Sequence, residues 1–279
     1  MKLASFKRDG RSSYGEVLGE EIADFGALDG APIDLKAAIA AGALPALAAR
    51  HAPRMALAEV ELLPVIPNPG KILCVGHNYE THRQETGRAK VDHPSIFTRF
   101  ADTLTANGAE IVRPKVSENL DYEGELAVII GKGGRHIAEV EALNHVAGYA
   151  PFNEASVRDW QWHTQQFIPG KNFPRTGGFG PWMVSADELP DPSTTSVTTR
   201  LNGQVVQSQP TADMLFSVQR IIAYVSSFTA LSAGDVICSG TPGGVGAKRT
   251  PPLWMKPGDT VEVEIPGVGL LKNTIGQEA

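Results

Sequence analysis

Apolar residues in this chain occur mostly in short runs that turn residues separate, a pattern typical of a strand-rich protein. Residues 71–76 and 126–130 are mainly apolar, and each run predicts a short buried strand. Polar and apolar residues alternate over 260–265, and Asn202-Gly203 within residues 197–207 suits the type I′ turn of a hairpin. We therefore expect an α+β fold with a β-rich core.

Helical spacing is less frequent in the chain. Residues 210–228 place apolar side chains on one helical face, with Met214, Leu215, Val218, Ile221, Ile222 and Val225. Residues 35–49 are rich in alanine, and residues 79–87 and 140–145 are shorter candidates. These segments predict a few helices beside the strands.

The N-terminal residues differ from the rest of the chain. They read as short strands with turns at Asp9-Gly10 and Gly15, followed by the alanine-rich segment. Pro64, Pro67 and Pro69 then remove backbone donors and favour extended chain. We expect a small N-terminal α/β domain over residues 1–66 and a second domain over 67–279.

Composition limits the possible functions. The 279 residues are 42% hydrophobic and carry a formal net charge of −6, so no basic stripe indicates a nucleic-acid binder. Cys74 and Cys238 lie in apolar runs, which favours buried thiols over a redox or nucleophilic role. No signal peptide or membrane-spanning run is evident, so we expect a cytoplasmic protein with no membrane partner.

Two separate acidic motifs are the first candidates. Glu123 and Glu125 are two apart at the start of an apolar strand, so their carboxylates should point to the same face. Such a pair repels unless a cation lies between the groups, and oxygen ligands suit Mg²⁺ or Mn²⁺. Glu154, which follows an apolar stretch, is a third acid. The alternative for Glu123 and Glu125 is a solvated strand end with exposed acids, and the alternative for Glu154 is a polar loop or a helix start.

A histidine and a lysine form the second candidate set. His82 and Glu85 are three apart, hence on one face of a helix, where the carboxylate would orient the imidazole as a general base. His77 precedes them in a turn, and Lys171 lies between Gly170 and Asn172. An exposed ion pair and an exposed lysine are the alternatives.

A glycine-rich segment, residues 239–246, would let backbone amides approach an anion. It lacks the Gly-Lys-Ser/Thr ending of a phosphate-binding loop, so nucleotide binding is not indicated. A tight structural turn is the alternative.

In this order the motifs resemble the fumarylacetoacetate hydrolase family. The matching stretches are CVGHNYETHRQE (74–85), DYEGELAVIIGK (121–132), GYAPFNEASVRDWQ (148–161), GKNF (170–173), GPW (180–182) and SGTPGGVG (239–246). The resemblance covers residues 65 to 275. It implies a mixed β-roll catalytic domain that follows a small N-terminal domain in the chain, and it implies a homodimer.

The resemblance also implies site residues. Glu123, Glu125 and Glu154 would bind Mg²⁺ or Mn²⁺, with Ca²⁺ possible. His82 and Glu85 would activate water on a lid that orders with substrate, and Lys171 would polarise the substrate. The substrate-binding residues would be Tyr79, Gln161, Arg175, Gly240 and Thr241.

Two positions depart from the family pattern. Glu154 stands where Asp is common, and Pro174-Arg175 replaces a frequent Asp-Thr pair. The longer Glu154 changes ligand reach, and Arg175 could pair with a second substrate carboxylate.

The implied activity is metal-dependent hydrolysis of a C–C bond in a small anionic 2,4-dioxo acid, as in the breakdown of aromatic compounds or sugar acids. Decarboxylation, or hydration or isomerisation, of a 2-oxo acid on the same fold stays open. The alternative of another class is a non-catalytic metal-binding scaffold.

Overall fold

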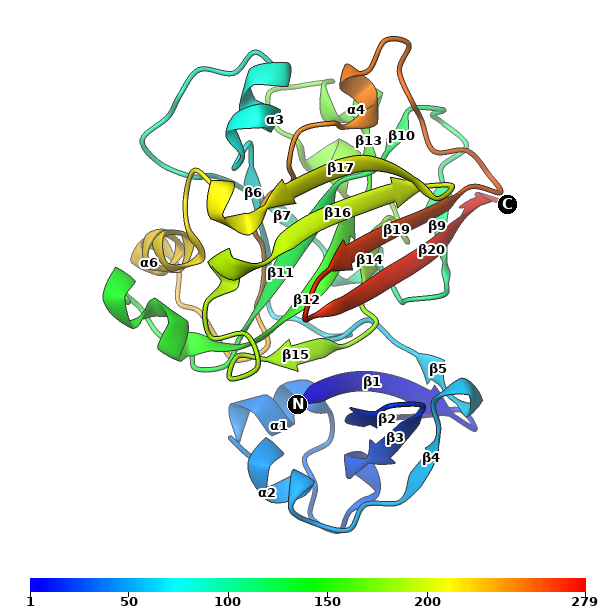
Figure 1. Ribbon diagram of the computed structural model, residues 1–279, viewed down its shortest axis with the longest axis vertical. Helices are drawn as coiled ribbons and strands as arrows, with labels where there is room; N and C mark the ends of the chain where they lie inside the picture. The colour runs from blue at the N-terminus through cyan, green and yellow to red at the C-terminus, as the bar shows by residue number, and fades with distance from the viewer.

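The computed structural model describes all 279 residues, which form a strand-rich body (Figure 1). The large sheet has 13 strands in the order β4-β3-β2-β1-β15-β12-β11-β18-β6-β7, with β5, β8 and β14 at its sides. Its strands are β1 (Lys2–Arg8), β2 (Arg11–Leu18), β3 (Glu21–Asp24), β4 (Arg54–Ala56), β5 (Glu61–Leu62), β6 (Ile72–Gly76), β7 (Ser95–Arg99), β8 (Leu104–Thr105), β11 (Gly124–Ile130), β12 (Val146–Glu154), β14 (Gly177–Phe179), β15 (Met183–Ser185) and β18 (Val236–Cys238).

A second sheet of five strands has the order β17-β16-β19-β20-β9. Its strands are β9 (Glu110–Arg113), β16 (Ser196–Leu201), β17 (Gln204–Pro210), β19 (Thr260–Ile265) and β20 (Gly269–Gln277), and a separate pair joins β10 (Leu120–Asp121) to β13 (Ser156–Val157). The α-helices are α1 (Leu35–Ala40), α2 (Leu44–Ala48), α3 (Glu80–Glu85), α4 (Arg158–Gln161), α5 (Ile168–Lys171) and α6 (Val218–Phe228). No helix is both long and apolar enough to cross a membrane.

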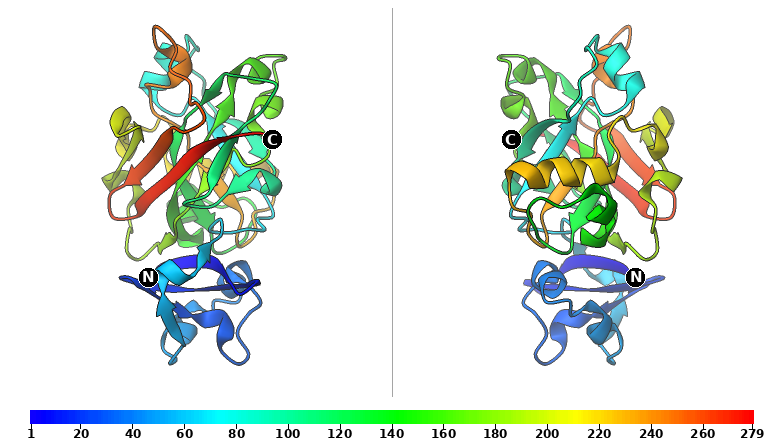
Figure 2. Two further views of the ribbon diagram at one scale, coloured as in Figure 1. Left: turned by 90° about the vertical axis from the view of Figure 1, so that its right-hand side faces the viewer. Right: turned by 90° about the vertical axis from the view of Figure 1, so that its left-hand side faces the viewer.

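The N-terminal strands and helices form a separate layer at one end of the molecule (Figures 1 and 2). The layer still shares the large sheet, because β1 pairs antiparallel with β15 through Leu3 and Met183. Leu3 and Leu35 also pack in one hydrophobic cluster with Ile72 and Cys74. The two units are thus joined by hydrogen bonds and by a common core, and the boundary at residue 66 stays a prediction.

The central strands carry apolar residues on both faces. Leu73 and Val75 of β6 pack in a cluster with Ile222 of α6, which lies across one face of the sheet (Figure 2). Their neighbours Ile72 and Cys74 belong to the cluster on the opposite face. Two-sided burial explains why these strands read as continuous apolar runs in the sequence.

Most expected elements are confirmed, with shifted ends. The strands at 72–76 and 124–130 are present, and Asn202 and Gly203 take φ values of 50° and 77° in the hairpin turn. The expected turn at Gly15 is wrong, because Gly15 lies inside β2, where a Cβ would collide with the carbonyl of Ala23.

Two helical predictions also need correction. The alanine-rich segment forms two short helices, since Gly42 adopts a φ of 60° between them. The predicted helix over 210–228 begins only at Val218, after a 3₁₀ turn, where Ser217 caps the helix by accepting a hydrogen bond from the Arg220 amide.

Four strand ends meet at one edge of the large sheet. β11 runs antiparallel to both β12 and β18, and β18 runs parallel to β6. The start of β11 therefore lies beside the ends of the other three strands. Glu123 and Glu125 lie at the start of β11 and Glu154 ends β12, while α3, which carries His82 and Glu85, follows β6 in the chain (Figure 1).

Candidate metal centre and active site

Three buried carboxylates converge at this edge. Glu123 and Glu125 flank the first residue of β11, and Glu154 ends β12. The strand register sets Gly124 opposite Asn153, which brings the three acids together. One oxygen from each lies within 4.8 Å of the others, and none of the three residues is more than 3% exposed.

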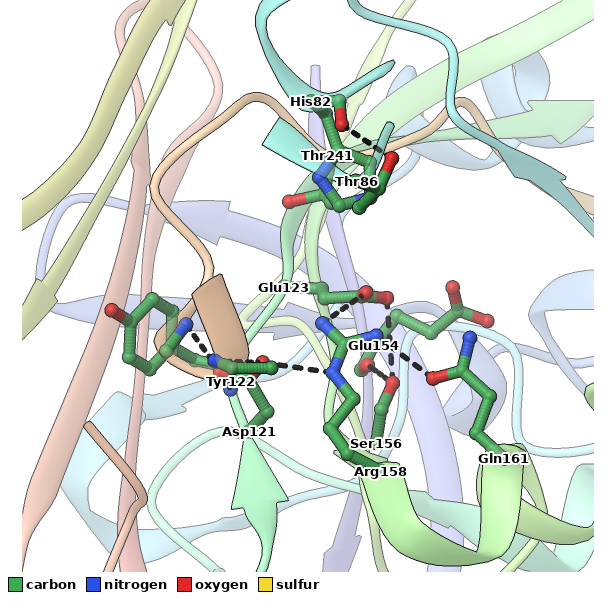
Figure 3. A network of polar contacts seen from close by, with 12 residues as sticks. His82, Thr86, Asp121, Tyr122, Glu123, Glu154, Ser156, Arg158, Gln161 and Thr241 are labelled. Carbon is green, nitrogen blue, oxygen red and sulfur yellow. Dashed lines mark hydrogen bonds and ion pairs between the residues drawn. The ribbon is translucent and has the colours of Figure 1, made fainter. Parts of the chain in front are cut away.

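Cations neutralise part of this acidic cluster. The Lys171 ammonium lies 2.5 Å from Oε2 of Glu123 and 3.1 Å from Oε2 of Glu154. The Arg158 guanidinium lies 2.6 Å from Oε1 of Glu123 (Figure 3). Because both cations are buried, each depends on the carboxylates for its stabilisation, and the carboxylates depend on them.

The acids respond differently to burial. Burial alone would raise the pKa of Glu123, but the charges of Arg158 and Lys171 outweigh burial and hold that pKa below its usual range. Burial, then the charge of Glu154, raise the pKa of Glu125 well above its usual range. Burial would lower the pKa of Lys171, but Glu123 and Glu154 outweigh it and raise that pKa, so the ammonium stays charged.

A histidine–glutamate pair, His82 and Glu85, forms the wall opposite the acids. Nδ1 of His82 lies 2.7 Å from Oε1 of Glu85, both on α3, as the spacing predicts. The other oxygen of Glu85 accepts a hydrogen bond of 2.8 Å from the Gly244 amide. Because the carboxylate holds one ring nitrogen, Nε2 of His82 is the nitrogen left for chemistry.

His77 stacks on the ring of His82. Their centroids are 5.1 Å apart and the planes differ by 12°. Burial, then the neighbouring His82, lower the pKa of His77 to about 4, so its ring is neutral near pH 7. His77 thus shapes the wall without adding charge to it.

Asp121 links Arg158 to the glycine-rich segment. Its carboxylate accepts hydrogen bonds from Nε of Arg158 at 2.8 Å, from the Gly246 amide at 2.7 Å and from the Ala247 amide at 3.0 Å (Figure 3). A Cβ at position 246 would lie 1.9 Å from the carbonyl of Leu253, so only glycine fits there. The segment therefore packs closely against its neighbours, and the buried carboxylate of Asp121 holds it in place.

One cleft contains most of the predicted residues. It is lined by Val75, Gly76, His77, His82, Thr86, Phe97, Glu123, Glu125, Glu154, Arg158, Gln161, Trp162, Phe167, Lys171, Thr241, Val245, Ala247 and Lys248. Glu85 reaches it through His82. Gly240 does not line it, but its amide donates a 2.8 Å hydrogen bond to Glu125.

Two predicted substrate residues lie elsewhere. Tyr79 is fully buried and does not line the cleft. Arg175 takes a φ of 56° in a turn, and its carbonyl accepts a hydrogen bond from the Val112 amide. Arg175 lines two other surface pockets and does not line this cleft.

Several residues of the cleft were not predicted. Arg158 lies in one of the motifs that match the family, but no local pattern assigns it a role. Phe97, Trp162 and Phe167 also line the cleft and form an aromatic wall. No local periodicity marks these residues, because they come from separate loops and strands.

The donor set fits a hard divalent cation. All three convergent groups offer carboxylate oxygens, which Mg²⁺ and Mn²⁺ prefer. Because the three acids are buried together, their carboxylates repel one another unless positive charge lies among them.

Comparison with known proteins identifies the family of the chain. The family model described as fumarylacetoacetate (FAA) hydrolase C-terminal matches residues 71–276. The chain belongs to the fumarylacetoacetate hydrolase family. The expected strand-rich fold of this family is thereby confirmed for residues 71–276, and the family consists of enzymes.

Curated relatives of the chain are named as oxaloacetate tautomerases. The chain is 42% identical to oxaloacetate tautomerase YisK of Bacillus subtilis over 79% of its own length and 74% of the relative. It is 40% identical to the human mitochondrial oxaloacetate tautomerase FAHD2A over 81% of its length and 73% of the relative. Both of these relatives are thus named for an activity other than hydrolysis.

Solved structures of family members match the whole chain. The fumarylacetoacetate hydrolase of Exiguobacterium antarcticum aligns with a TM-score of 0.87 at 35% identity, covering 100% of both chains. A maleylpyruvate hydrolase from Sphingobium sp. SYK-6, solved with manganese(II) and pyruvate, aligns with a TM-score of 0.83 at 29% identity and the same coverage.

Proposed function

We propose that the protein is a divalent-metal-dependent enzyme that interconverts the enol and keto forms of oxaloacetate or a closely similar 2-oxo dicarboxylic acid. The observation that carries the proposal is the Glu85-held His82 facing the same cleft as the three carboxylates. The names of the 40–42% identical relatives support this activity over the expected C–C hydrolysis.

The residues have distinct parts in this reaction. Glu123, Glu125 and Glu154 would hold Mg²⁺ or Mn²⁺, which when bound supplies a Lewis acid for the 2-oxo group. Lys171 and Arg158 line the cleft beside the three carboxylates, and their positive charge would stabilise an anionic oxo-acid and its enolate.

Tautomerisation moves one proton between the enol oxygen and the carbon next to the one that bears this oxygen. His82 is placed to carry that proton. Glu85 fixes the ring orientation and stabilises the imidazolium that forms when Nε2 accepts the proton. The apolar wall of Phe97 and Phe167 limits water beside the enolate.

C–C hydrolysis of a 2,4-dioxo acid is the second candidate. The same His82–Glu85 pair suits activation of a water molecule. The manganese and pyruvate in the maleylpyruvate hydrolase structure support a shared core for both reactions. The two reactions differ in whether His82 delivers a proton to carbon or takes one from water.

The test is turnover of a small panel by protein stripped with EDTA and reloaded with Mn²⁺. Faster loss of enol oxaloacetate without release of pyruvate or CO₂ is the expected result. If the protein leaves oxaloacetate unchanged but converts an acylpyruvate into pyruvate and a carboxylic acid, it is a hydrolase. CO₂ from oxaloacetate would establish a decarboxylase, and no turnover in any metal-loaded sample would refute all three.

A further inference from the structure

A fully buried arginine lies behind the metal-ligand candidates. Arg99 ends β7 and is 2% exposed. Its Nη1 donates to the Ala155 carbonyl at 3.1 Å and its Nη2 to Oγ1 of Thr176 at 2.5 Å, while Nε lies 3.5 Å from Oγ1 of Thr103. The guanidinium is therefore held from three sides and keeps a fixed position.

This fixed charge faces one oxygen of Glu154. Nη1 of Arg99 lies 3.9 Å from Oε1 of Glu154, and both side chains are almost completely buried. That oxygen accepts no hydrogen bond, whereas Oε2 lies 3.1 Å from Nζ of Lys171. The two oxygens of one carboxylate thus have different partners: Oε2 pairs with Lys171, and Oε1 faces Arg99.

We propose that Arg99 is a specificity-determining residue that retains Oε1 of Glu154, leaves only Oε2 for a cation, and so favours Mg²⁺ and Mn²⁺ over Ca²⁺. The inference rests on the metal dependence in the proposed function. It concerns which divalent ion the site selects, and neither the reaction nor the substrate.

The reason lies in how these ions are coordinated. Ca²⁺ takes about six to eight oxygens and readily accepts both oxygens of one carboxylate. Mg²⁺ demands an octahedral shell, and one oxygen from each of several carboxylates, completed by water, satisfies it. Glutamate is long enough to present both oxygens when nothing holds one of them away.

The experiment is calorimetric titration of Mn²⁺ and of Ca²⁺ into EDTA-stripped protein, with the ratio of the two dissociation constants as readout. Arg99→Gln removes the charge while a side-chain amide can still donate to Ala155 or Thr176. We expect this variant to shift the ratio toward Ca²⁺ by about tenfold or more, the size of effect that outer partners have on metal sites. Arg99→Lys is the matched control that keeps the charge, and its ratio should stay near that of the unaltered protein.

Glu154→Asp completes the test, because the shorter side chain withdraws the carboxylate from Arg99. In this background Arg99→Gln should leave the ratio unchanged. An equal shift in both backgrounds would overturn the inference, since the charge would then act on all cations directly. An unchanged ratio in Arg99→Gln alone would also overturn it.

Circular dichroism of each stripped variant checks that it folds. If Arg99→Gln does not fold, Thr176→Val, which removes one of the anchors of the guanidinium, replaces it, and an unchanged ratio overturns the inference in the same way. Binding of both ions with an unchanged ratio leaves the proposed function standing, whereas no binding of either ion by the unaltered protein refutes both.

Discussion

The floor and the wall of the cleft are built differently. The floor is defined as Glu123, Glu125, Glu154 and Lys171, and all four residues are almost completely buried. The three acids lie at the ends of the paired strands β11 and β12, and Lys171 ends α5. The wall, defined as α3 with His82 and Glu85, is a six-residue helix. Side-chain hydrogen bonds hold the wall, as between the Gly244 amide and Glu85.

This difference separates two tasks. The sheet fixes the floor, so the positions of the metal-ligand candidates change only if the core changes. The wall rests on a few partly exposed contacts, so the histidine can adjust to a substrate without disturbing the floor. Substitutions of the three floor carboxylates should therefore remove metal binding, whereas substitutions in the wall should lower turnover and leave metal binding intact.

The largest effect is expected in the floor. Glu125→Gln keeps the shape of the side chain and can still accept a hydrogen bond from the Gly240 amide, but it replaces a carboxylate ligand with a neutral amide. We expect loss of both turnover and the rise in melting temperature that Mn²⁺ gives the unaltered protein. A metal-induced rise equal to that of the unaltered protein would show that Glu125 is not a ligand.

The next effect is expected in the wall. His82→Gln should lower kcat by about 10²–10⁴-fold, the usual contribution of a general acid–base group. The Mn²⁺-induced rise in melting temperature should not change, because His82 is outside the donor set. A variant that lost metal stabilisation as well would break the separation of floor and wall.

A smaller effect is expected where the floor meets the glycine-rich segment. Asp121→Asn leaves the buried Arg158 with Glu123 as its one remaining carboxylate partner. We expect the free energy of unfolding to fall by about 3 kcal/mol, at the low end for a broken buried pair. Urea unfolding measures this, and Asp187→Asn, an exposed acid, should have no such cost.

The smallest effect is expected at the outer side of the wall. Thr81→Val removes a hydrogen bond of 2.6 Å to Gln209 and another of 3.0 Å from the Gly243 amide. Local opening of α3 should become easier by about 1 kcal/mol, with roughly fivefold faster amide exchange over residues 80–85. Equal acceleration across β11 would mean that wall and floor unfold together.

The sequence predicts the parts of this site that depend on local geometry. Glu123 and Glu125 are two apart, and His82 and Glu85 are three apart, so one strand and one helix suffice to pair them. The position of Glu154 depends on the register of β12 against β11, which no local pattern reveals.

Long-range placement also explains the failures. Arg99 and Arg158 reach the acids from distant segments, so their charges appear ordinary in the sequence. Arg175 follows the GKNF motif closely but turns away from the cleft, so proximity in sequence was misleading. Cys74 and Cys238 are confirmed as buried, yet only the strand register shows that they lie opposite each other.

The rate at which enol oxaloacetate decays is the most direct test of the proposed activity. It should be measured with Mn²⁺-loaded protein, with EDTA-stripped protein and with Mn²⁺-loaded His82→Gln. We predict acceleration by the loaded protein alone, with the stripped sample near the buffer rate and the variant reduced about 10²–10⁴-fold. Acceleration that survives both EDTA and His82→Gln would contradict a metal-dependent proton transfer by His82.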